Sequence, residues 1–277
     1  MTRLIYDFGM NNGDDTDYYL RKGARVVAVE ANPALCAGCT ARFAAAIADQ
    51  RLVILNVALG ASASDQPITF YVHRRNHVLS RVHPPKPERQ NEFDAVMVPE
   101  RTASTIVHQY GWPHYVKLDV EGLDAAVLRD LFQAGIHPDF ISAEAGSVEP
   151  FALLVAEGYT AFNLVEGATV RDVYRNATIS TANGPVTYSF PHHSAGPYGE
   201  DLRSPWWDAD AFLTVLAVAQ LGWKDVHASR VLPPTPQQAL PRPPVEFRSH
   251  VTDIIPSFCR ALKARLGRSH PISGIDC

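Results

Sequence analysis

The sequence lacks the features that mark several protein classes. None of its apolar stretches approaches the length needed to cross a membrane. Its lysines and arginines form no long run, and the net charge is −4, whereas nucleic-acid binding needs a clustered basic surface. With 46% hydrophobic and 19% charged residues, the chain has the balance of an ordinary globular protein. We therefore expect no membrane span and no nucleic-acid partner.

The first residues do not resemble a signal peptide. Residues 1–7 (MTRLIYD) run directly into a predicted strand, which leaves no room for an apolar core and a cleavage site. We therefore expect a cytoplasmic protein.

Cysteine is scarce, with four in the chain. Cys36 and Cys39 are spaced as CxxC, which is compatible with a zinc or redox site. Zinc would need a second pair of this kind, but Cys259 and Cys277 stand alone. Because the segment around the CxxC reads as the first turns of a helix, we favour a packing role for both thiols.

Short apolar runs alternate with helical patterns through the first two-thirds of the chain. This order predicts βαβ units and a mainly parallel sheet. The predicted strands are residues 4–8, 25–30, 52–59, 67–72, 93–99, 115–119, 140–144 and 159–165. The predicted helices are residues 14–22, 33–49, 102–110, 124–134, 148–158 and 208–221, with a short terminal helix over 254–266 after a proline-rich segment.

The turn after the first strand carries the clearest functional signal. Residues 7–13 (DFGMNNG) leave that strand and enter a helix, and glycines there allow a sharp bend and the close approach of a ligand. Glu30 ends the next strand, where a carboxylate can accept hydrogen bonds from both hydroxyls of a ribose. Together they predict an adenosine-type cofactor.

The charge of this turn discriminates between cofactors. A pyrophosphate needs a helix N-terminus free of competing anions, but Asp7, Asp14, Asp15 and Asp17 crowd this one, and the glycines do not follow GxGxxG. Two unit charges ~4 Å apart interact by about 4 kcal/mol at an effective dielectric of about 20. S-adenosylmethionine carries an ammonium and a sulfonium but no phosphate, so we predict this cofactor over a nicotinamide dinucleotide. Helix capping is the alternative role for Asp14 or Asp15, but it does not account for Asp7.

Several motifs occur in the order expected of one family. They are Asp7-x-Gly9-x-Asn11-x-Gly13, residues 27–33 (VAVEANP), residues 56–60 (NVALG) and residues 117–122 (KLDVEG). In these motifs the sequence resembles the FkbM family of methyltransferases, and residues 194–201 and 223–228 resemble a C-terminal block of a subset of that family. Two positions depart from the family pattern: Ala31, where proline is common, and Asp124, where glutamate is usual.

The resemblance implies a class I methyltransferase, Rossmann-like α/β fold, with helices on both faces of a mainly parallel seven-stranded sheet that has one antiparallel strand. It also implies O-methylation of a hydroxyl on a small-molecule acceptor such as a sugar, glycoside or polyketide-like product. The alternatives are N-methylation of a small-molecule or peptide acceptor, a nicotinamide-dependent oxidoreductase, and a binding protein that has kept the fold without activity.

We expect three parts in the chain. Residues 1–190 would form the cofactor-binding domain, with an inserted substrate-side region over 72–101. Residues 191–230 would complete the substrate pocket, and residues 231–277 would be a proline-rich linker and terminal helix. The tail is interpreted as a flexible end, and an arm of a homodimer is the alternative.

Site residues are expected at the carboxyl ends of the core strands, where such folds have their crevice. The expected cofactor contacts are Asp7, Gly9, Asn11, Gly13, Glu30, Ala31, Asn56, Ala58 and Asp119. Methyl transfer to a hydroxyl needs in-line positioning and removal of a proton, for which the candidates are Asp119, Glu121, Lys117 and His193.

Each candidate also has a simpler structural interpretation. Asp119 can cap the following turn, and Lys117 can pair with a carboxylate. No metal is predicted, but a divalent cation, if bound, would have Asp119, Glu121 and Glu144 as oxygen ligands. Further candidates for the pocket wall are His73, His77, His192, His227, Trp206, Trp207 and Trp223, although packing is the favoured role of the tryptophans.

Overall fold

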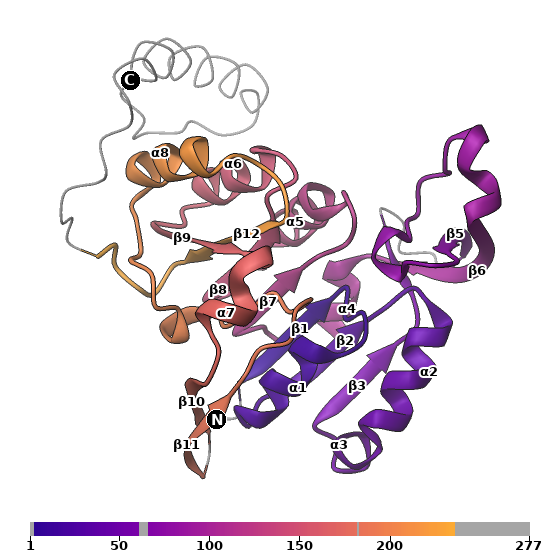
Figure 1. The fold of residues 1–277 in the computed structure, drawn as a ribbon, viewed down its shortest axis with the longest axis horizontal. Helices are drawn as coiled ribbons and strands as arrows, with labels where there is room; N and C mark the ends of the chain where they lie inside the picture. The colour runs from indigo at the N-terminus through magenta and orange to yellow at the C-terminus, as the bar shows by residue number, and fades with distance from the viewer. Residues whose placement is uncertain (1–2, 61–65, 182, 236–277) are drawn as a thin grey trace. The chain divides into compact units, whose positions relative to one another are not determined.

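The computed structural model describes residues 3–60, 66–181 and 183–235 (Figure 1). The predicted terminal helix over 254–266 and most of the proline-rich segment lie outside the described residues. Within the described ranges, no helix is long and apolar enough to cross a membrane.

Seven strands form the main sheet, in the order β3-β2-β1-β7-β8-β12-β9. Neighbouring strands run parallel except β12, which is antiparallel to both β8 and β9. The strands are β1 (Leu4–Phe8), β2 (Arg25–Val29), β3 (Leu52–Leu55), β7 (Tyr115–Leu118), β8 (Phe140–Glu144), β9 (Ala161–Glu166) and β12 (Lys224–Ser229). This sheet confirms the expected α/β fold with one antiparallel strand.

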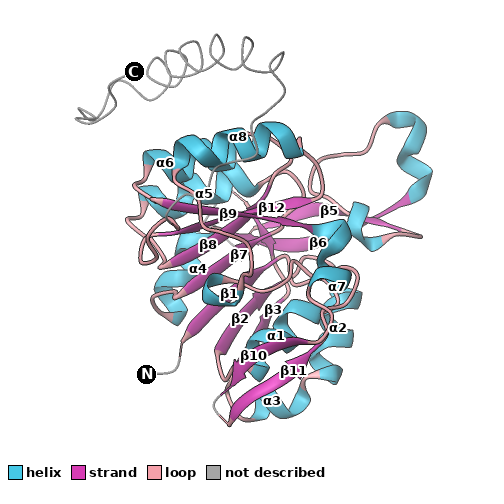
Figure 2. Ribbon diagram, turned by 60° about the vertical axis from the view of Figure 1, so that its left-hand side comes forward, coloured by secondary structure: helices cyan, strands magenta, loops and turns pink. Residues whose placement is uncertain are grey.

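The central strands are buried on both faces, because their side chains alternate between two apolar cores. In β2, Val27 and Val29 belong to one core, whereas Val26 and Ala28 belong to the other. The first core holds α4 (Ala103–Tyr110), α5 (Asp124–Gln133), α6 (Glu149–Ala156) and α8 (Ala209–Ala219). The second core holds α1 (Asp14–Arg21), α2 (Pro33–Arg42) and α3 (Ala44–Ala48), so helices cover both faces (Figure 2).

Two predicted elements are divided in the structure. The predicted helix 33–49 breaks at Phe43, which leaves helical geometry (φ −107°, ψ 23°) and separates α2 from α3. The predicted strand 52–59 is β3 followed by β4 (Ala58–Leu59), which lies in a different sheet. The chain leaves the main sheet at Asn56, whose side-chain amide donates to the carbonyl oxygens of Glu30 and Ala31 (2.9 and 3.0 Å).

A small second sheet carries the inserted region. It has the order β4-β6-β5, with β5 (Pro67–His73) antiparallel to β6 (Phe93–Arg101). Two short 3₁₀ helices, His77–Leu79 and Pro87–Glu92, lie between these strands. Figure 1 shows this part projecting at one end of the described unit.

The chain after residue 176 holds three strands that the sequence patterns did not predict. β10 (Ala177–Thr181) and β11 (Gly184–Tyr188) form an antiparallel hairpin, and β12 enters the main sheet between β8 and β9. The main sheet therefore contains strands from both sides of the boundary expected at residue 190. Residues 3–60, 66–181 and 183–235 belong to one compact unit, in which the ring of Tyr198 stacks on Tyr115 of β7 (4.1 Å between centroids, 5° between planes).

Candidate active site

A pocket of about 370 Å³ opens at the carboxyl ends of β1, β2, β7 and β8. This volume lies in the range of small-molecule sites. Six of the residues predicted to contact the cofactor line the pocket, namely Gly9, Asn11, Glu30, Ala31, Ala58 and Asp119. The remaining wall includes residues 77–82 of the inserted region, residues 120, 121 and 123, Glu144, His193 and Trp223.

The turn after β1 needs a glycine at its first bend. Gly9 has φ +85°, and its amide and that of Met10 donate to the carbonyl oxygen of Val29 (3.0 and 2.9 Å). A Cβ atom at Gly9 would lie 1.8 Å from the carbonyl oxygen of Asp119. Glycine therefore allows two strand ends to approach each other at the pocket.

Glu30 is held in place by the backbone. One carboxylate oxygen accepts from the Asn11 amide (2.8 Å) and the other from the Asn32 amide (2.7 Å). Burial raises the pKa of Glu30 above its usual range, against the lowering effect of these two amides. Asn11 lies beside it with a buried side-chain oxygen that has no hydrogen-bond partner among the described residues. Both residues therefore present acceptor oxygens at the pocket.

Three of the residues predicted to contact the cofactor do not line the pocket. Asp7 is fully buried and accepts from the Thr16 hydroxyl (2.6 Å). Gly13 is the N-cap of α1 with φ +81°, where a Cβ atom would meet the ring of Phe43 at 2.6 Å. Asn56 tethers the carbonyls at the end of β2, as described above. These residues shape the site from behind its surface.

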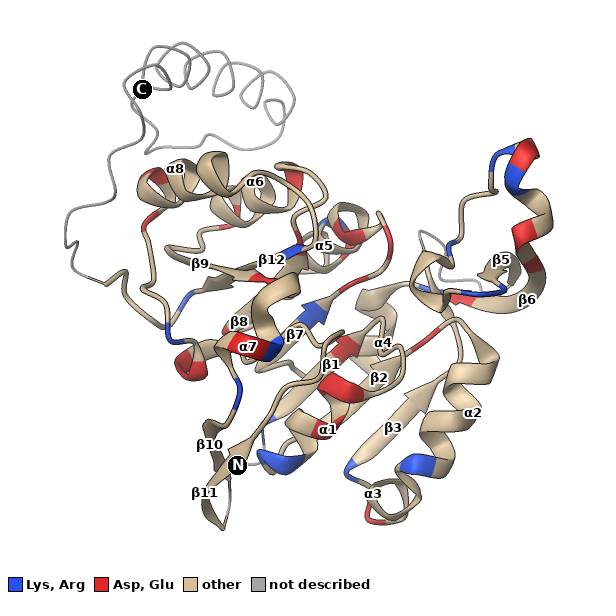
Figure 3. Cartoon of the chain, viewed as in Figure 1, with Lys and Arg blue, Asp and Glu red and all other residues tan. Residues whose placement is uncertain are grey.

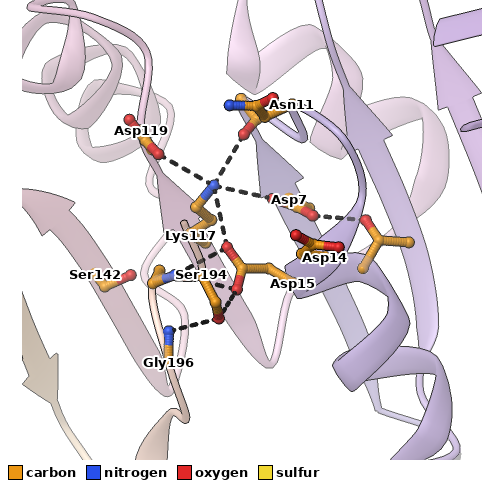
Figure 4. A network of polar contacts seen from close by, with 12 residues as sticks. Asp7, Asn11, Asp14, Asp15, Lys117, Asp119, Ser142, Ser194 and Gly196 are labelled. Atoms are coloured by element: carbon orange, nitrogen blue, oxygen red, sulfur yellow. Dashed lines mark hydrogen bonds and ion pairs between the residues drawn. The ribbon is translucent and has the colours of Figure 1, made fainter. Parts of the chain in front are cut away.

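Lys117 is the centre of a buried polar network (Figure 4). Its Nζ atom donates to the carbonyl oxygen of Gly9 (2.8 Å) and lies 3.5, 3.6 and 3.4 Å from carboxylate oxygens of Asp7, Asp15 and Asp119. Burial lowers the pKa of Lys117, but these carboxylates outweigh that effect and hold it well above the usual range. A lysine held in its charged form cannot take a proton, which does not suit Lys117 to the role of base.

Asp15 joins this network to the C-terminal part of the chain. It accepts hydrogen bonds from the Ser194 hydroxyl and from the Ala195 amide (3.1 Å). Burial raises its pKa to about 6, although Lys117 acts in the opposite direction. The capping role considered for Asp14 or Asp15 is wrong, because α1 has no side-chain cap. The acidic residues of α1 (Figure 3) were visible in the sequence, but the contact with Ser194, 179 residues away, had no local signal.

Three carboxylates meet at the wall formed by β7 and β8. Asp119 is partly exposed and pairs with Lys117. Partial burial, with the negative charges of Asp119 and Glu144, raises the pKa of Glu121 to about 8. Burial, with Asp119 and Asp124, raises the pKa of Glu144 to about 7. Carboxyl groups with pKa values near neutral are suited to accepting a proton at neutral pH.

Comparison with known proteins decides the family. The methyltransferase FkbM domain matches residues 7–161, which is more than half of the chain. The chain belongs to the FkbM methyltransferase family. A comparison with curated proteins finds no match.

Solved structures share only a distant likeness with this FkbM methyltransferase. A precorrin-6y C5,15-methyltransferase from Geobacter metallireducens is 10% identical, with a TM-score of 0.34 over 82% of this chain and 78% of that chain. An O-methyltransferase from Bacillus cereus in complex with SAH is 9% identical, with a TM-score of 0.36 over 82% and 74%. These likenesses are too distant to bear on the acceptor.

The histidines and tryptophans of this FkbM methyltransferase divide between the pocket and the interior. His77, His193 and Trp223 line the pocket. The other candidates do not line the pocket. His73 contacts Glu92 (3.3 Å), and exposed His192 packs on His193 and Trp223. His227 and Trp206 are buried, and the backbone of Trp207 pairs with Phe162.

The two alternative metal sites receive no support from the geometry. Among the described residues, no three His, Cys, Asp or Glu side chains are grouped to hold a metal ion, and this includes Asp119, Glu121 and Glu144. Cys36 and Cys39 are buried free thiols that contact the carbonyl oxygens of Glu30 (3.2 Å) and Asn11 (3.5 Å). They pack behind the cofactor turn, as favoured from the sequence.

Proposed function

We propose that this FkbM methyltransferase transfers a methyl group from S-adenosylmethionine to a hydroxyl of a small acceptor of the sugar, glycoside or polyketide-like class. One observation carries the proposal: a single pocket brings the anchored carboxylate of Glu30 together with Glu121, whose pKa of about 8 suits a proton acceptor. A carboxylate fixed by two amides keeps free lone pairs for the two hydroxyls of a ribose.

The residues of the turn fit this cofactor better than a phosphate-bearing one. The pocket wall there offers acceptor oxygens of Glu30 and Asn11, and Asp7 and Asp15 lie behind it. A pyrophosphate would meet this negative charge at a helix start. We therefore assign cofactor contacts to Gly9, Asn11, Glu30, Ala31, Ala58 and Asp119, with supporting roles for Asp7, Gly13 and Asn56.

S-adenosylmethionine, when bound, supplies an activated methyl group, so the protein has to orient the acceptor and remove its proton. We assign the removal of the acceptor's proton to Glu121. Asp119, two residues before Glu121, would orient the acceptor hydroxyl. Lys117 would fix Asp119 relative to Gly9, because its ammonium contacts both residues. His193 also lines the pocket and is the second candidate for proton acceptor.

Isothermal titration calorimetry tests the cofactor assignment. We expect S-adenosylmethionine and S-adenosylhomocysteine to bind and NAD to fail. Absence of binding by both adenosyl compounds would overturn the proposal. Labelled methyl transfer to a panel of hydroxylated and amino acceptors, with NMR analysis of the product, then shows whether oxygen or nitrogen is methylated. The same assay with a chelator reports on metal dependence.

A further inference from the structure

Glu144 presents a carboxylate without a protein partner to the pocket. It ends β8, lines the pocket and is partly buried. Among the described residues, its side chain makes no hydrogen bond and no ion pair, whereas its backbone amide donates to Asp124 (3.3 Å). A partly buried carboxylate is stabilised by a compensating positive group, so the pocket is suited to receive such a group from outside.

Trp223 and this carboxylate line the same pocket, and the backbone of the sheet sets where Trp223 lies. Asp225 of β12 is the antiparallel partner of Glu144. Beyond this pair, the Ala145 amide donates to the carbonyl oxygen of Lys224 (2.7 Å), and the Gly222 amide donates to that of Ala145 (3.2 Å). These two hydrogen bonds flank Trp223 on both sides, so its position relative to β8 is fixed by backbone.

The indole of Trp223 packs against Gly167 and His193 but is also accessible from the pocket. Gly167 packs so closely that a Cβ atom there would lie 2.5 Å from the indole Nε1. The ring of His193 stacks on Trp223 (5.8 Å between centroids, 30° between planes). Even so, Trp223 is 41% exposed and lines the pocket. An accessible indole and a carboxylate that line one pocket can together bind an organic cation.

Acidic side chains outnumber basic ones in the pocket. Its lining includes the carboxylates of Glu30, Asp119, Glu121 and Glu144, but Arg81 is its only lysine or arginine among the described residues. The Nε of Arg81 donates to the carbonyl oxygen of Leu79 (3.2 Å). The nearby ammonium of Lys117 is already shared among three aspartates. Once Glu121 and Glu144 are ionised, the pocket therefore repels an anionic acceptor.

We propose that the acceptor carries a cationic ammonium group, which binds between the Glu144 carboxylate and the Trp223 indole. This inference rests on the proposed function and names its acceptor class: hydroxylated amines, such as amino sugars or amino alcohols, rather than phosphorylated or carboxylated compounds. Glu144 lies on β8, one strand beyond β7, whereas the cofactor turn and Glu30 follow β1 and β2. This separation assigns Glu144 to the acceptor.

Choline and 3,3-dimethylbutan-1-ol test the proposal, because they have the same shape and differ in charge. Titrations of the full chain, alone and saturated with S-adenosylhomocysteine, are followed by saturation-transfer NMR on the methyl signals of each probe. We expect choline to bind about tenfold tighter than the neutral probe. The preference should disappear in Glu144→Gln and in Trp223→Leu, and it should persist in Asp49→Asn, which removes an exposed carboxylate outside the pocket.

Three results would overturn the proposal. The first is equal binding of the two probes, or no binding of choline. The second is a loss of S-adenosylhomocysteine affinity in Glu144→Gln, which would assign this carboxylate to the cofactor. The third is saturable binding of Mg²⁺ alone that requires Glu144 and excludes choline. Calorimetry with S-adenosylhomocysteine on the same unmodified sample reports separately on the proposed function.

Discussion

The Nζ atom of Lys117 donates a 2.8 Å hydrogen bond to the carbonyl oxygen of Gly9 and so ties β7 to the turn that follows β1. The same ammonium lies within 3.6 Å of carboxylate oxygens of Asp7, Asp15 and Asp119. One buried cation therefore controls both the backbone geometry of the turn and the charge behind it.

Replacing Lys117 by methionine should destabilise the protein strongly. The substitution leaves Asp7 and Asp15 buried without their cation, and breaking a buried pair by removing one partner costs about 3–5 kcal/mol. Urea unfolding measures the loss. Lys86→Met, at an exposed position, should change the free energy of unfolding by less than about 0.5 kcal/mol. A loss for Lys117→Met as small as that of the control would contradict the role given to the network.

Gly9 and Gly122 form a matched pair for testing the turn. Both have positive φ angles (+85° and +86°), but a Cβ atom at Gly9 would meet the Asp119 carbonyl at 1.8 Å, whereas nothing lies within 4 Å at Gly122. Gly122→Ala should cost about 1 kcal/mol from backbone strain alone. Gly9→Ala should cost several times more and should abolish binding of S-adenosylhomocysteine. Similar losses of stability and affinity in the two variants would show that the close approach is unimportant.

Glu30→Gln should weaken cofactor binding and cost about 1–3 kcal/mol of stability, because one backbone amide loses its acceptor. An amide in this place retains one acceptor oxygen but turns its NH₂ group toward a backbone amide of Asn11 or Asn32. Loss of a charge-assisted hydrogen bond corresponds to an increase of about 10- to 100-fold in the Kd for S-adenosylhomocysteine. Calorimetry measures it, with Asp49→Asn as the control for charge. An unchanged Kd would remove Glu30 from the cofactor site.

The pH dependence of turnover should report on Glu121. As proton acceptor it must be ionised, and its pKa is raised to about 8. kcat/KM should therefore rise about tenfold per pH unit below pH 8 and level off above it. Glu121→Gln should lower kcat by about a hundredfold to ten-thousandfold and remove this limb. If the limb persists in the variant, His193 is the better candidate, and His193→Gln should then remove it.

Local sequence patterns predicted much of the fold. The alternation of short apolar runs with helical segments predicted the parallel part of the sheet because strands buried on both faces must be apolar throughout. The antiparallel β12 had no such signal. Its sequence, KDVHAS, contains charged and polar residues, and buried His227 has its pKa lowered to about 3 by the loss of water. Its place between β8 and β9 follows from packing of the whole sheet.

The candidate site was likewise predicted in part from local sequence and decided in part by the tertiary structure. The sequence by itself determined that a glycine turn follows β1 and that an acid ends β2, because bend geometry and strand length are local properties. It also placed Asp119, Glu121 and Glu144 at strand ends. Only the tertiary structure decided which of the predicted residues face the pocket, because that depends on neighbours far away in the chain.

Three outcomes show this most clearly. Asp7, a predicted cofactor contact, is fully buried and pairs with Lys117. Asp15, interpreted as a possible cap, holds Ser194 in the C-terminal part. Trp223, for which packing was favoured, is 41% exposed and lines the same pocket as Glu144. Sequence patterns describe one element at a time, whereas a charge, a stack or a pocket wall exists only where elements distant in sequence pack together.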